Sequence, residues 1–153
     1  MTIPLEIIDL SKAYDTKEAV RNISFKVNEN EIIGILGPNG CGKTTTIGMI
    51  LGLLKPTKGK VLINGIEIEK QRVNLLNELN FISPYIELPK KLTVKQNLEV
   101  YGRLYDVKEL GIKIDYLCEK LRLNEFINKI TGELSSGQKN RVSLAKSIIN
   151  DPS

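Results

Sequence analysis

The run from Gly37 to Thr44 reads Gly-Pro-Asn-Gly-Cys-Gly-Lys-Thr and fills every fixed position of the pattern G-x-x-x-x-G-K-[ST]. The preceding run, 31–36, is apolar and β-favouring, which predicts a buried strand. The following run, 45–51, predicts a helix whose N-terminus lies at the loop. A strand, a glycine-rich loop and a helix in this order predict an α/β fold.

This loop has the chemistry of a phosphate cradle. Glycine lets the backbone approach closely, successive N–H groups point inward, and the helix start adds roughly half a positive charge. We therefore predict that the chain binds a nucleoside triphosphate; a glycine-rich turn that matches by chance is the alternative. The predicted nucleotide contacts are Gly37, Asn39, Gly40, Cys41, Gly42, Lys43, Thr44 and Thr45.

Two side chains of the loop have predicted roles in chemistry. Lys43 is expected to reach the β- and γ-phosphates and act as the catalytic cation, and the Thr44 hydroxyl to ligate Mg²⁺. Cys41 has two interpretations, a small residue tolerated in the loop or a reactive thiol at a helix N-terminus.

The composition is that of an ordinary globular domain. Of the 153 residues, 41% are apolar and 26% are charged. The net charge of +4 is spread along the sequence, so no nucleic-acid partner is expected. The two cysteines lie far apart in sequence and the first residues lack a signal peptide, which favours a reduced, cytoplasmic setting. The longest apolar stretch, 47–54, is too short to span a bilayer.

Periodicity divides the chain into a strand-rich front and a helical remainder. Strands are expected at 5–10, 19–27, 60–66 (before an Asn64-Gly65 turn) and 79–82, a polar loop at 13–17, and helices at 72–78 and over much of 93–130. Thr93 with Gln96 and Ser135 with Gln138 match capping boxes. We expect one domain with three parts: a nucleotide-binding core with a β-subdomain (1–87), a helical subdomain (88–135), and a helix returning to the core (136–153).

The pentapeptide Leu134–Gln138, Leu-Ser-Ser-Gly-Gln, precedes an amphipathic helix. Alone it indicates only a well-capped helix. Together with the phosphate loop and the helical stretch between them, it makes the chain resemble the ATP-binding cassette (ABC) ATPases, whose signature is LSGGQ. The Pro-x-x-Gly turn at 56–59 and the run 92–98, which is similar to the family's LTVxENL helix start, extend the resemblance.

The resemblance implies ATP and Mg²⁺ as ligands, and a phosphate-loop core with an antiparallel β-subdomain and an α-helical subdomain. Tyr14 falls where the family stacks an aromatic ring on adenine; a loop tyrosine without a ligand is the alternative. Two copies would bind head to tail, each ATP lying between 37–45 of one copy and Ser135, Ser136, Gly137 and Gln138 of the other. A transmembrane permease is the expected partner, docking near 83–105, with the ATPase peripheral on the inner face of the membrane.

Three positions depart from the family pattern. Pro84 aligns with the usual Mg²⁺-contacting glutamine, so Ser83, Tyr85 or water would have to substitute. Ser136 replaces the first of the signature's paired glycines. The strand that should carry the Mg²⁺-ordering Asp and the general-base Glu would follow Ser153, and the sequence contains no histidine. We therefore expect an N-terminal part of a longer ATPase that binds ATP but hydrolyses it poorly.

Three alternatives remain. One is a soluble ABC-type ATPase that acts in translation or DNA maintenance, and the short, globular insert between the two motifs favours transport over it. A nucleotide kinase is the second, against which Tyr14 and Leu134–Gln138 count. The third is a natural nucleotide-binding module that does not hydrolyse ATP.

Overall fold

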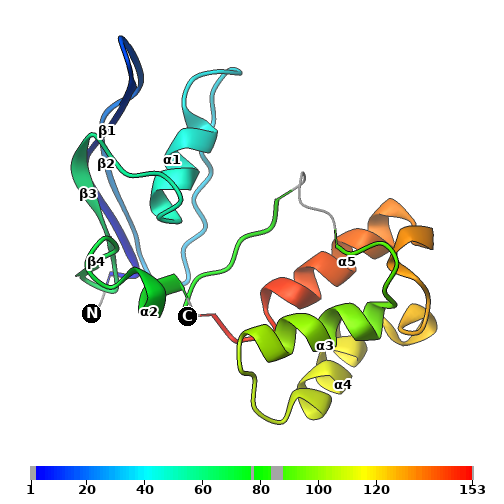
Figure 1. Ribbon diagram of the computed structural model, residues 1–153. Coiled ribbons are helices and arrows are strands. Elements are labelled where there is room, and N and C mark those ends of the chain that lie inside the picture. The colour runs from blue at the N-terminus through cyan, green and yellow to red at the C-terminus, as the bar shows by residue number, and fades with distance from the viewer. Residues whose placement is uncertain (1–2, 77, 84–87, 153) are drawn as a thin grey trace. The chain divides into compact units, whose positions relative to one another are not determined.

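The computed structural model describes residues 3–76, 78–83 and 88–152 of the chain. These form two compact units, Met1–Leu76 and Asn77–Ser153, drawn from blue to green and from green to red in Figure 1. The two units meet between residues 76 and 77, and the predicted three-part division at 87 and 135 stays a prediction. Pro84 and Tyr85 lie outside the described residues.

The first unit is built on an antiparallel sheet in the order β2-β1-β3-β4. The strands are β1 (Leu5–Tyr14), β2 (Lys17–Val27), β3 (Lys58–Ile63) and β4 (Ile66–Glu67). The predicted strands at 5–10, 19–27 and 60–66 and the Asn64-Gly65 turn are confirmed. The predicted polar loop at 13–17 is wrong, because Tyr14 pairs with Lys17 and leaves a two-residue turn between the strands. Asp15 takes a φ of +50° there, a conformation that aspartate tolerates.

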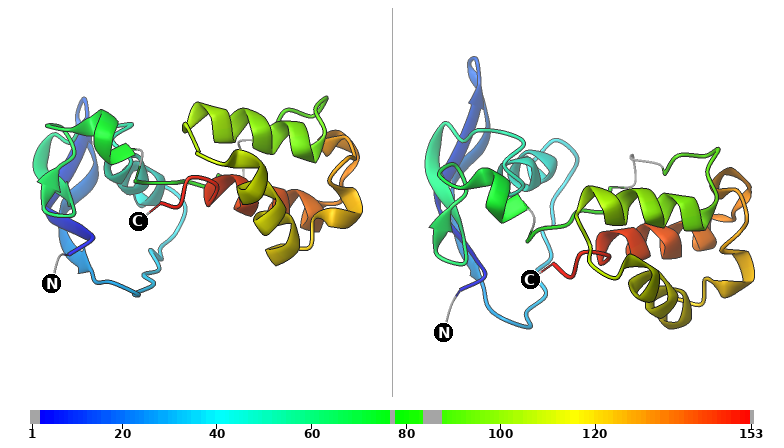
Figure 2. Two further views of the ribbon diagram at one scale, coloured as in Figure 1. Left: turned by 90° about the horizontal axis from the view of Figure 1, so that it is seen from below. Right: turned by 60° about the horizontal axis from the view of Figure 1, so that its bottom comes forward.

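Two helices complete this unit, α1 (Lys43–Ile50) and α2 (Arg72–Leu76), so the helices predicted at 45–51 and 72–78 are confirmed. Helix α1 lies beside the sheet in the views of Figures 1 and 2. Its Met49 is buried, as are sheet residues on both sides of the β1–β3 pairing, Ile7, Leu10, Val61 and Ile63.

The strand predicted at 31–36 is not formed. Ile32 is 98% exposed and Leu36 is 93% exposed. The run is extended chain outside the sheet, and no described segment of the first unit pairs with it. A strand needs a neighbour for its N–H and C=O groups, so apolar, β-favouring residues alone do not make one. The strand predicted at 79–82 is wrong for the same reason: the run joins no sheet, and Phe81 and Ile82 are exposed.

The second unit packs three helices, α3 (Val94–Leu104), α4 (Leu110–Lys120) and α5 (Ser136–Ser147). Two 3₁₀ turns, η1 (Asn124–Phe126) and η2 (Thr131–Glu133), connect α4 to α5. The helical pattern predicted beyond Lys120 is broken at Arg122, whose φ is +52°. The shared core comprises Leu88, Val94, Leu98, Ile114, Leu117, Cys118, Leu123, Phe126, Leu134, Val142, Ala145 and Ile149.

Both predicted capping boxes are confirmed. At α3 the Thr93 hydroxyl accepts from the Gln96 N–H at 3.2 Å, and the Gln96 side-chain oxygen accepts from the Thr93 N–H at 2.9 Å. At α5 the corresponding distances between Ser135 and Gln138 are 3.3 and 2.9 Å. Since Gln96 is used in its box, it cannot replace the missing glutamine at Pro84.

Burial shifts the pKa values of two side chains in the second unit. Burial lowers the pKa of the Lys146 ammonium, which lies 4.5 Å from the centre of the Tyr101 ring. Burial, and to a smaller extent the nearby Asp115 carboxylate, raises the pKa of the Cys118 thiol. Among the helices that the structure describes, none has the length and apolar character needed to span a membrane.

Candidate nucleotide-binding site

The loop before α1 takes a shape that only glycine accepts easily. Gly40 and Gly42 have φ values of +83° and +95°. At Gly42 an added Cβ would collide with the carbonyl oxygen of Ala19 and lie 2.9 Å from Cγ2 of Val20. The loop is therefore pressed against the backbone of β2 at Gly42, whereas the space around Gly40 is open.

The N-terminus of α1 presents free donors. Its N-cap is Gly42, which has no side chain to cap the helix, and the first helical bond runs from the Thr46 N–H to the Gly42 carbonyl at 2.8 Å. No described residue outside the helix accepts from the N–H groups of Lys43, Thr44 and Thr45. Uncapped donors and the positive end of the helix dipole together suit an anion.

The Lys43 side chain folds back over its own loop. Its ammonium donates to the carbonyl oxygens of Gly37 and Pro38, both at 2.7 Å, and lies 3.9 Å from the Cys41 sulfur. Within the part of the chain that the structure describes, no carboxylate forms an ion pair with it. The cation is thus held by neutral oxygens that phosphate oxygens can replace.

The remaining predicted loop contacts are accessible. Asn39, Cys41 and Thr44 are exposed and Thr45 is half-buried, while Thr46 uses its hydroxyl to bond the Gly42 carbonyl at 3.0 Å. The described residues hold no group of three or more His, Cys, Asp or Glu side chains that could bind a metal ion. The Thr44 hydroxyl is therefore the group that could hold Mg²⁺, together with oxygens of the nucleotide.

Tyr14 ends β1 with 46% of its surface exposed, and the Lys12 ammonium lies 5.2 Å from the centre of its ring. Its place relative to the loop follows from the strand pairing. Tyr14 pairs with Lys17, and Ala19, two residues further along β2, touches Gly42. The tip of the hairpin and the loop consequently lie at the same end of the first unit (Figure 1).

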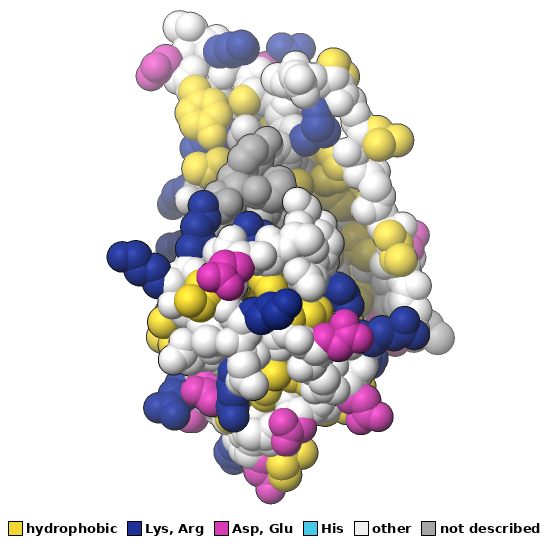
Figure 3. All heavy atoms as spheres, turned by 90° about the vertical axis from the view of Figure 1, so that its right-hand side faces the viewer, with side chains coloured by type: hydrophobic (Ala, Val, Ile, Leu, Met, Phe, Trp, Pro, Cys, Tyr) yellow, Lys and Arg dark blue, Asp and Glu magenta, His cyan; other side chains and the backbone are white. Residues whose placement is uncertain are grey.

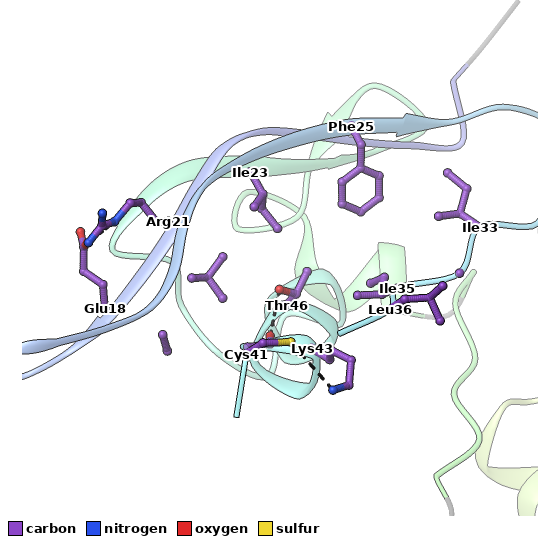
Figure 4. Close-up of a pocket in the computed structure, with 14 residues that line it drawn as sticks. Glu18, Arg21, Ile23, Phe25, Ile33, Ile35, Leu36, Cys41, Lys43 and Thr46 are labelled. Atoms are coloured by element: carbon purple, nitrogen blue, oxygen red, sulfur yellow. Dashed lines mark hydrogen bonds and ion pairs between the residues drawn. The ribbon is translucent and has the colours of Figure 1, made fainter. Parts of the chain in front are cut away.

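A cavity of about 630 Å³ borders the loop. As Figure 4 shows, Ile23 and Phe25 project from β2 toward the run that carries Ile33, Ile35 and Leu36, and Cys41 and Lys43 lie at its phosphate-loop end. The alternation of apolar residues predicted the strand at 19–27, but the sequence did not predict an open cavity beside it.

The second predicted contact region lies in the second unit. Leu134 is buried in its core, whereas Ser135, Ser136 and Gly137 are exposed. No described residue outside the helix accepts from the N–H groups of Ser136 and Gly137, and a Cβ added to Gly137 would meet nothing within 4 Å. On the face drawn in Figure 3, Lys and Arg side chains alternate with Asp and Glu and form no continuous basic stripe.

Comparison with known proteins agrees with this geometry. A family model described as "ABC transporter" matches residues 20–153. The Nod factor export ATP-binding protein I of Rhizobium etli is 35% identical over 150 residues, which is 97% of this chain and 48% of that protein. The ABC transporter ATP-binding protein NatA of Bacillus subtilis is 31% identical over 155 residues, 97% of this chain and 63% of that protein.

Two solved structures share the fold. An ATP-binding subunit of an ABC transporter matches with a TM-score of 0.86 and 27% identity, covering 99% of this chain and 63% of that one. CbiO1 of Clostridium perfringens, described as part of the ABC transporter complex cbiONQ, matches with a TM-score of 0.86 and 26% identity over 99% of this chain and 63% of that one.

The fold is thus that of a phosphate-loop ATPase core with an antiparallel β-subdomain and an α-helical subdomain. The chain belongs to the ABC transporter family of ATP-binding proteins. It spans about half the length of the Nod factor export proteins that it matches.

Proposed function

We propose that this chain is the ATP-binding part of an ABC transporter subunit, which couples ATP binding and hydrolysis to transport through a separate membrane permease. One observation carries the proposal. The loop 37–42 leads into an uncapped helix N-terminus, and the Lys43 ammonium is held by the carbonyl oxygens of Gly37 and Pro38 beside the Cys41 sulfur. This arrangement offers N–H donors and one exchangeable cation to a polyphosphate.

Each end of the nucleotide has a proposed partner in the first unit. The phosphates lie on Gly37–Thr45, with Lys43 on the β- and γ-phosphates and Thr44 on Mg²⁺. The adenine stacks on the exposed Tyr14 ring at the neighbouring hairpin. Mg²⁺ bridges phosphate oxygens and neutralises the charge that develops during phosphoryl transfer.

The second copy is proposed to close the site through Ser135–Gln138. Two features support this role: no described residue outside the helix accepts from the N–H groups of Ser136 and Gly137, and no described atom beyond the helix lies within 4 Å of a Cβ added at Gly137. No steric contact with the described part of the fold requires glycine at position 137, so the absence of a side chain there leaves room for a ligand bound to a second copy. The Ser136 side chain is exposed at the same helix start, where it would meet the partner's γ-phosphate.

A membrane permease is the proposed partner in transport. The Nod factor export protein is named for export, and CbiO1 is described as part of a transporter complex. From the similarity to these two proteins we infer that this chain lies at the inner face of a membrane. Docking near 83–105 would couple it to the transport pathway.

The proposal includes a low rate of ATP hydrolysis by residues 1–153. An efficient site requires a Mg²⁺-binding carboxylate and a group that orients the water. The described residues supply no carboxylate cluster of this kind. A polypeptide of residues 1–153 should therefore bind ATP–Mg²⁺ but release phosphate slowly.

Isothermal titration and a phosphate-release assay on residues 1–153 test this function. We expect saturable ATP–Mg²⁺ binding that Lys43→Ala weakens by about 10- to 100-fold, with little release of phosphate. ATP hydrolysis at the rate of an ordinary ABC ATPase, lost in Lys43→Ala, would show that no further residues are needed. Failure of a longer form to bind any membrane protein would favour the soluble ATPase over the transporter subunit.

A further inference from the structure

Two segments of the second unit are joined along their length by backbone hydrogen bonds. One runs through residues 90–95 into α3, and the other is 127–132, just before the capped start of α5. The bonds run from Val94 N–H to Lys129 O at 3.1 Å, Lys95 N–H to Ile127 O at 2.9 Å, Thr131 N–H to Leu92 O at 2.9 Å and Gly132 N–H to Lys90 O at 3.0 Å.

These bonds use donors that a helix normally leaves free. The N–H groups of Val94 and Lys95 lie in the first turn of α3, and carbonyls of the other segment accept from both. At Gly132 the contact is so close that an added Cβ would lie 3.0 Å from the Lys90 carbonyl oxygen. The turn before α5 is therefore held against the segment that leads into α3.

Asn97 closes this junction from inside. Only 1% of its surface is exposed. Its side-chain NH₂ group donates to the Thr131 hydroxyl at 2.8 Å, and lies 3.1 and 3.2 Å from the carbonyl oxygens of Thr93 and Pro89. One amide group thus contacts the loop before α3, the N-cap of α3 and the turn before α5.

The other half of the same amide is its side-chain oxygen, which is buried and to which no described group donates. A buried acceptor without a donor destabilises a fold. Turning the amide over would place its oxygen against the acceptor oxygens of Thr93 and Pro89, so the observed orientation is the one that the surrounding acceptors require.

The contact lies close to the proposed second nucleotide contact. Thr131 is in η2, and the chain runs from there through the buried Leu134 to Ser135, the N-cap of α5. With Thr131 and Leu134 both anchored, the intervening backbone has little freedom to move Ser135.

We propose that Asn97 is a positioning residue, which through Thr131 sets where Ser135–Gln138 stands when it meets the nucleotide of a second copy. The inference rests on the proposed function of the signature segment. Asn97 itself touches no ligand; it acts through the turn 130–132.

Asn97→Leu and Thr131→Val test this role, because each removes one side of the contact with little change in volume. Thr131→Ser keeps the hydroxyl and serves as the conservative rescue. Asn128→Ala changes an exposed asparagine close to the same turn and is the matched control. Hydrogen exchange of the backbone amides, ATP affinity by titration, and sedimentation with and without ATP are measured on the 153-residue chain.

We expect Asn97→Leu and Thr131→Val to speed exchange at Thr131 and Gly132 by about tenfold. ATP affinity of the first unit should be unchanged and ATP-dependent association should weaken by about tenfold. Thr131→Ser and Asn128→Ala should behave as the original chain. Because the two changes remove one shared contact, the double variant should be no worse than the more affected single variant.

The outcomes separate the inference from the proposed function. Unchanged exchange at Thr131 and Gly132 in both variants would overturn the positioning role. So would faster exchange spread evenly over α3, α4 and α5, or failure of Thr131→Ser to restore the original behaviour. If the original chain binds no ATP, or does not associate with it, the proposed function fails, while the exchange measurement still decides whether Asn97 holds the turn.

Discussion

The Lys43 ammonium donates to the carbonyl oxygen of Gly37 at 2.7 Å, so the cation of the phosphate loop is bound by the loop's own first residue. The same ammonium also bonds the Pro38 carbonyl at 2.7 Å. Under the proposed function, binding of a phosphate would exchange these two bonds to neutral oxygens for bonds to charged oxygens, which are stronger.

The first prediction concerns this exchange. Lys43→Ala should weaken ATP–Mg²⁺ binding by about 10- to 100-fold, since a hydrogen bond to a charged group contributes roughly 1.5–3 kcal/mol. Isothermal titration gives the affinity. Lys55→Ala, which removes an exposed lysine of the same unit that pairs with Glu69 at 3.7 Å, is the control and should bind normally. Equal affinity of Lys43→Ala and the original chain would contradict the role of Lys43.

The second prediction compares two glycines of the loop. Gly40→Ala should destabilise the first unit by about 1–2 kcal/mol, the cost of a positive φ in a residue with a Cβ. Gly42→Ala should cost about 2–4 kcal/mol, because its Cβ also collides with β2 at Ala19 and Val20. Urea unfolding measures both. An equal loss of unfolding free energy in the two variants would mean that the contact with β2 does not contribute to stability.

The third prediction tests Tyr14 as the adenine contact. Tyr14→Ala should weaken ATP binding by about 1–3 kcal/mol, whereas Tyr14→Phe keeps the ring and should be nearly neutral. Titration with tripolyphosphate serves as the control, because that ligand lacks a base and should bind all three proteins equally. Undiminished ATP affinity in Tyr14→Ala would leave Tyr14 as a loop residue without a ligand.

The fourth prediction uses two glycines in equivalent places. Gly111 and Gly137 are each the second residue of a helix, and a Cβ at either would lie more than 4 Å from every described atom beyond its chain neighbours and its own turn of helix. Alanine at either position should stabilise the second unit by up to about 1 kcal/mol. Only Gly137→Ala should also weaken ATP-dependent association, since its methyl group would point into the space left for a partner's nucleotide. Thermal unfolding and sedimentation measure the two effects.

The fifth prediction follows from the unpaired run 31–36. Its exposed Ile32 and Leu36, together with backbone groups that no strand of its unit pairs with, favour self-association of residues 1–153. Sedimentation velocity should show less association for Ile32→Lys and Leu36→Lys. Val73→Lys, at an exposed valine of α2, is the control for added charge and should change little. A monomeric original chain would contradict this prediction.

The sequence predicted well the features that depend on near neighbours. Helix α1, the turn at Asn64-Gly65 and both capping boxes follow from residues within one or two turns of chain, and all are confirmed. The run 31–36 was predicted wrongly because a strand depends on a partner elsewhere in the chain, which propensity does not reveal. The polar loop at 13–17 was wrong because pairing of Tyr14 with Lys17 outweighs the polarity of the intervening residues.

The candidate site divides in the same way. The residue types of the phosphate loop and of Ser135–Gln138 were evident from their motifs. The two carbonyl partners of Lys43 and the contact of Gly42 with Ala19 were not, because both depend on how the loop folds in three dimensions. Asn97 could have been singled out only as a polar residue on the buried side of a helix, and its bond to Thr131 joins residues far apart in sequence.

The contact of Gly42 with Ala19 has a further consequence for selectivity. It joins the phosphate loop to the hairpin that carries Tyr14, so under the proposed function one backbone-to-backbone contact would set the distance between the two ends of a bound nucleotide. The fixed separation between Tyr14 and the phosphate loop would then favour ligands whose length matches it. A nucleotide that is long enough to contact both Tyr14 and the phosphate loop gains binding free energy from both contacts, whereas adenosine or pyrophosphate gains it from only one. A substitution at Gly42 that increases this separation should therefore weaken the binding of ATP more than the binding of adenosine or pyrophosphate.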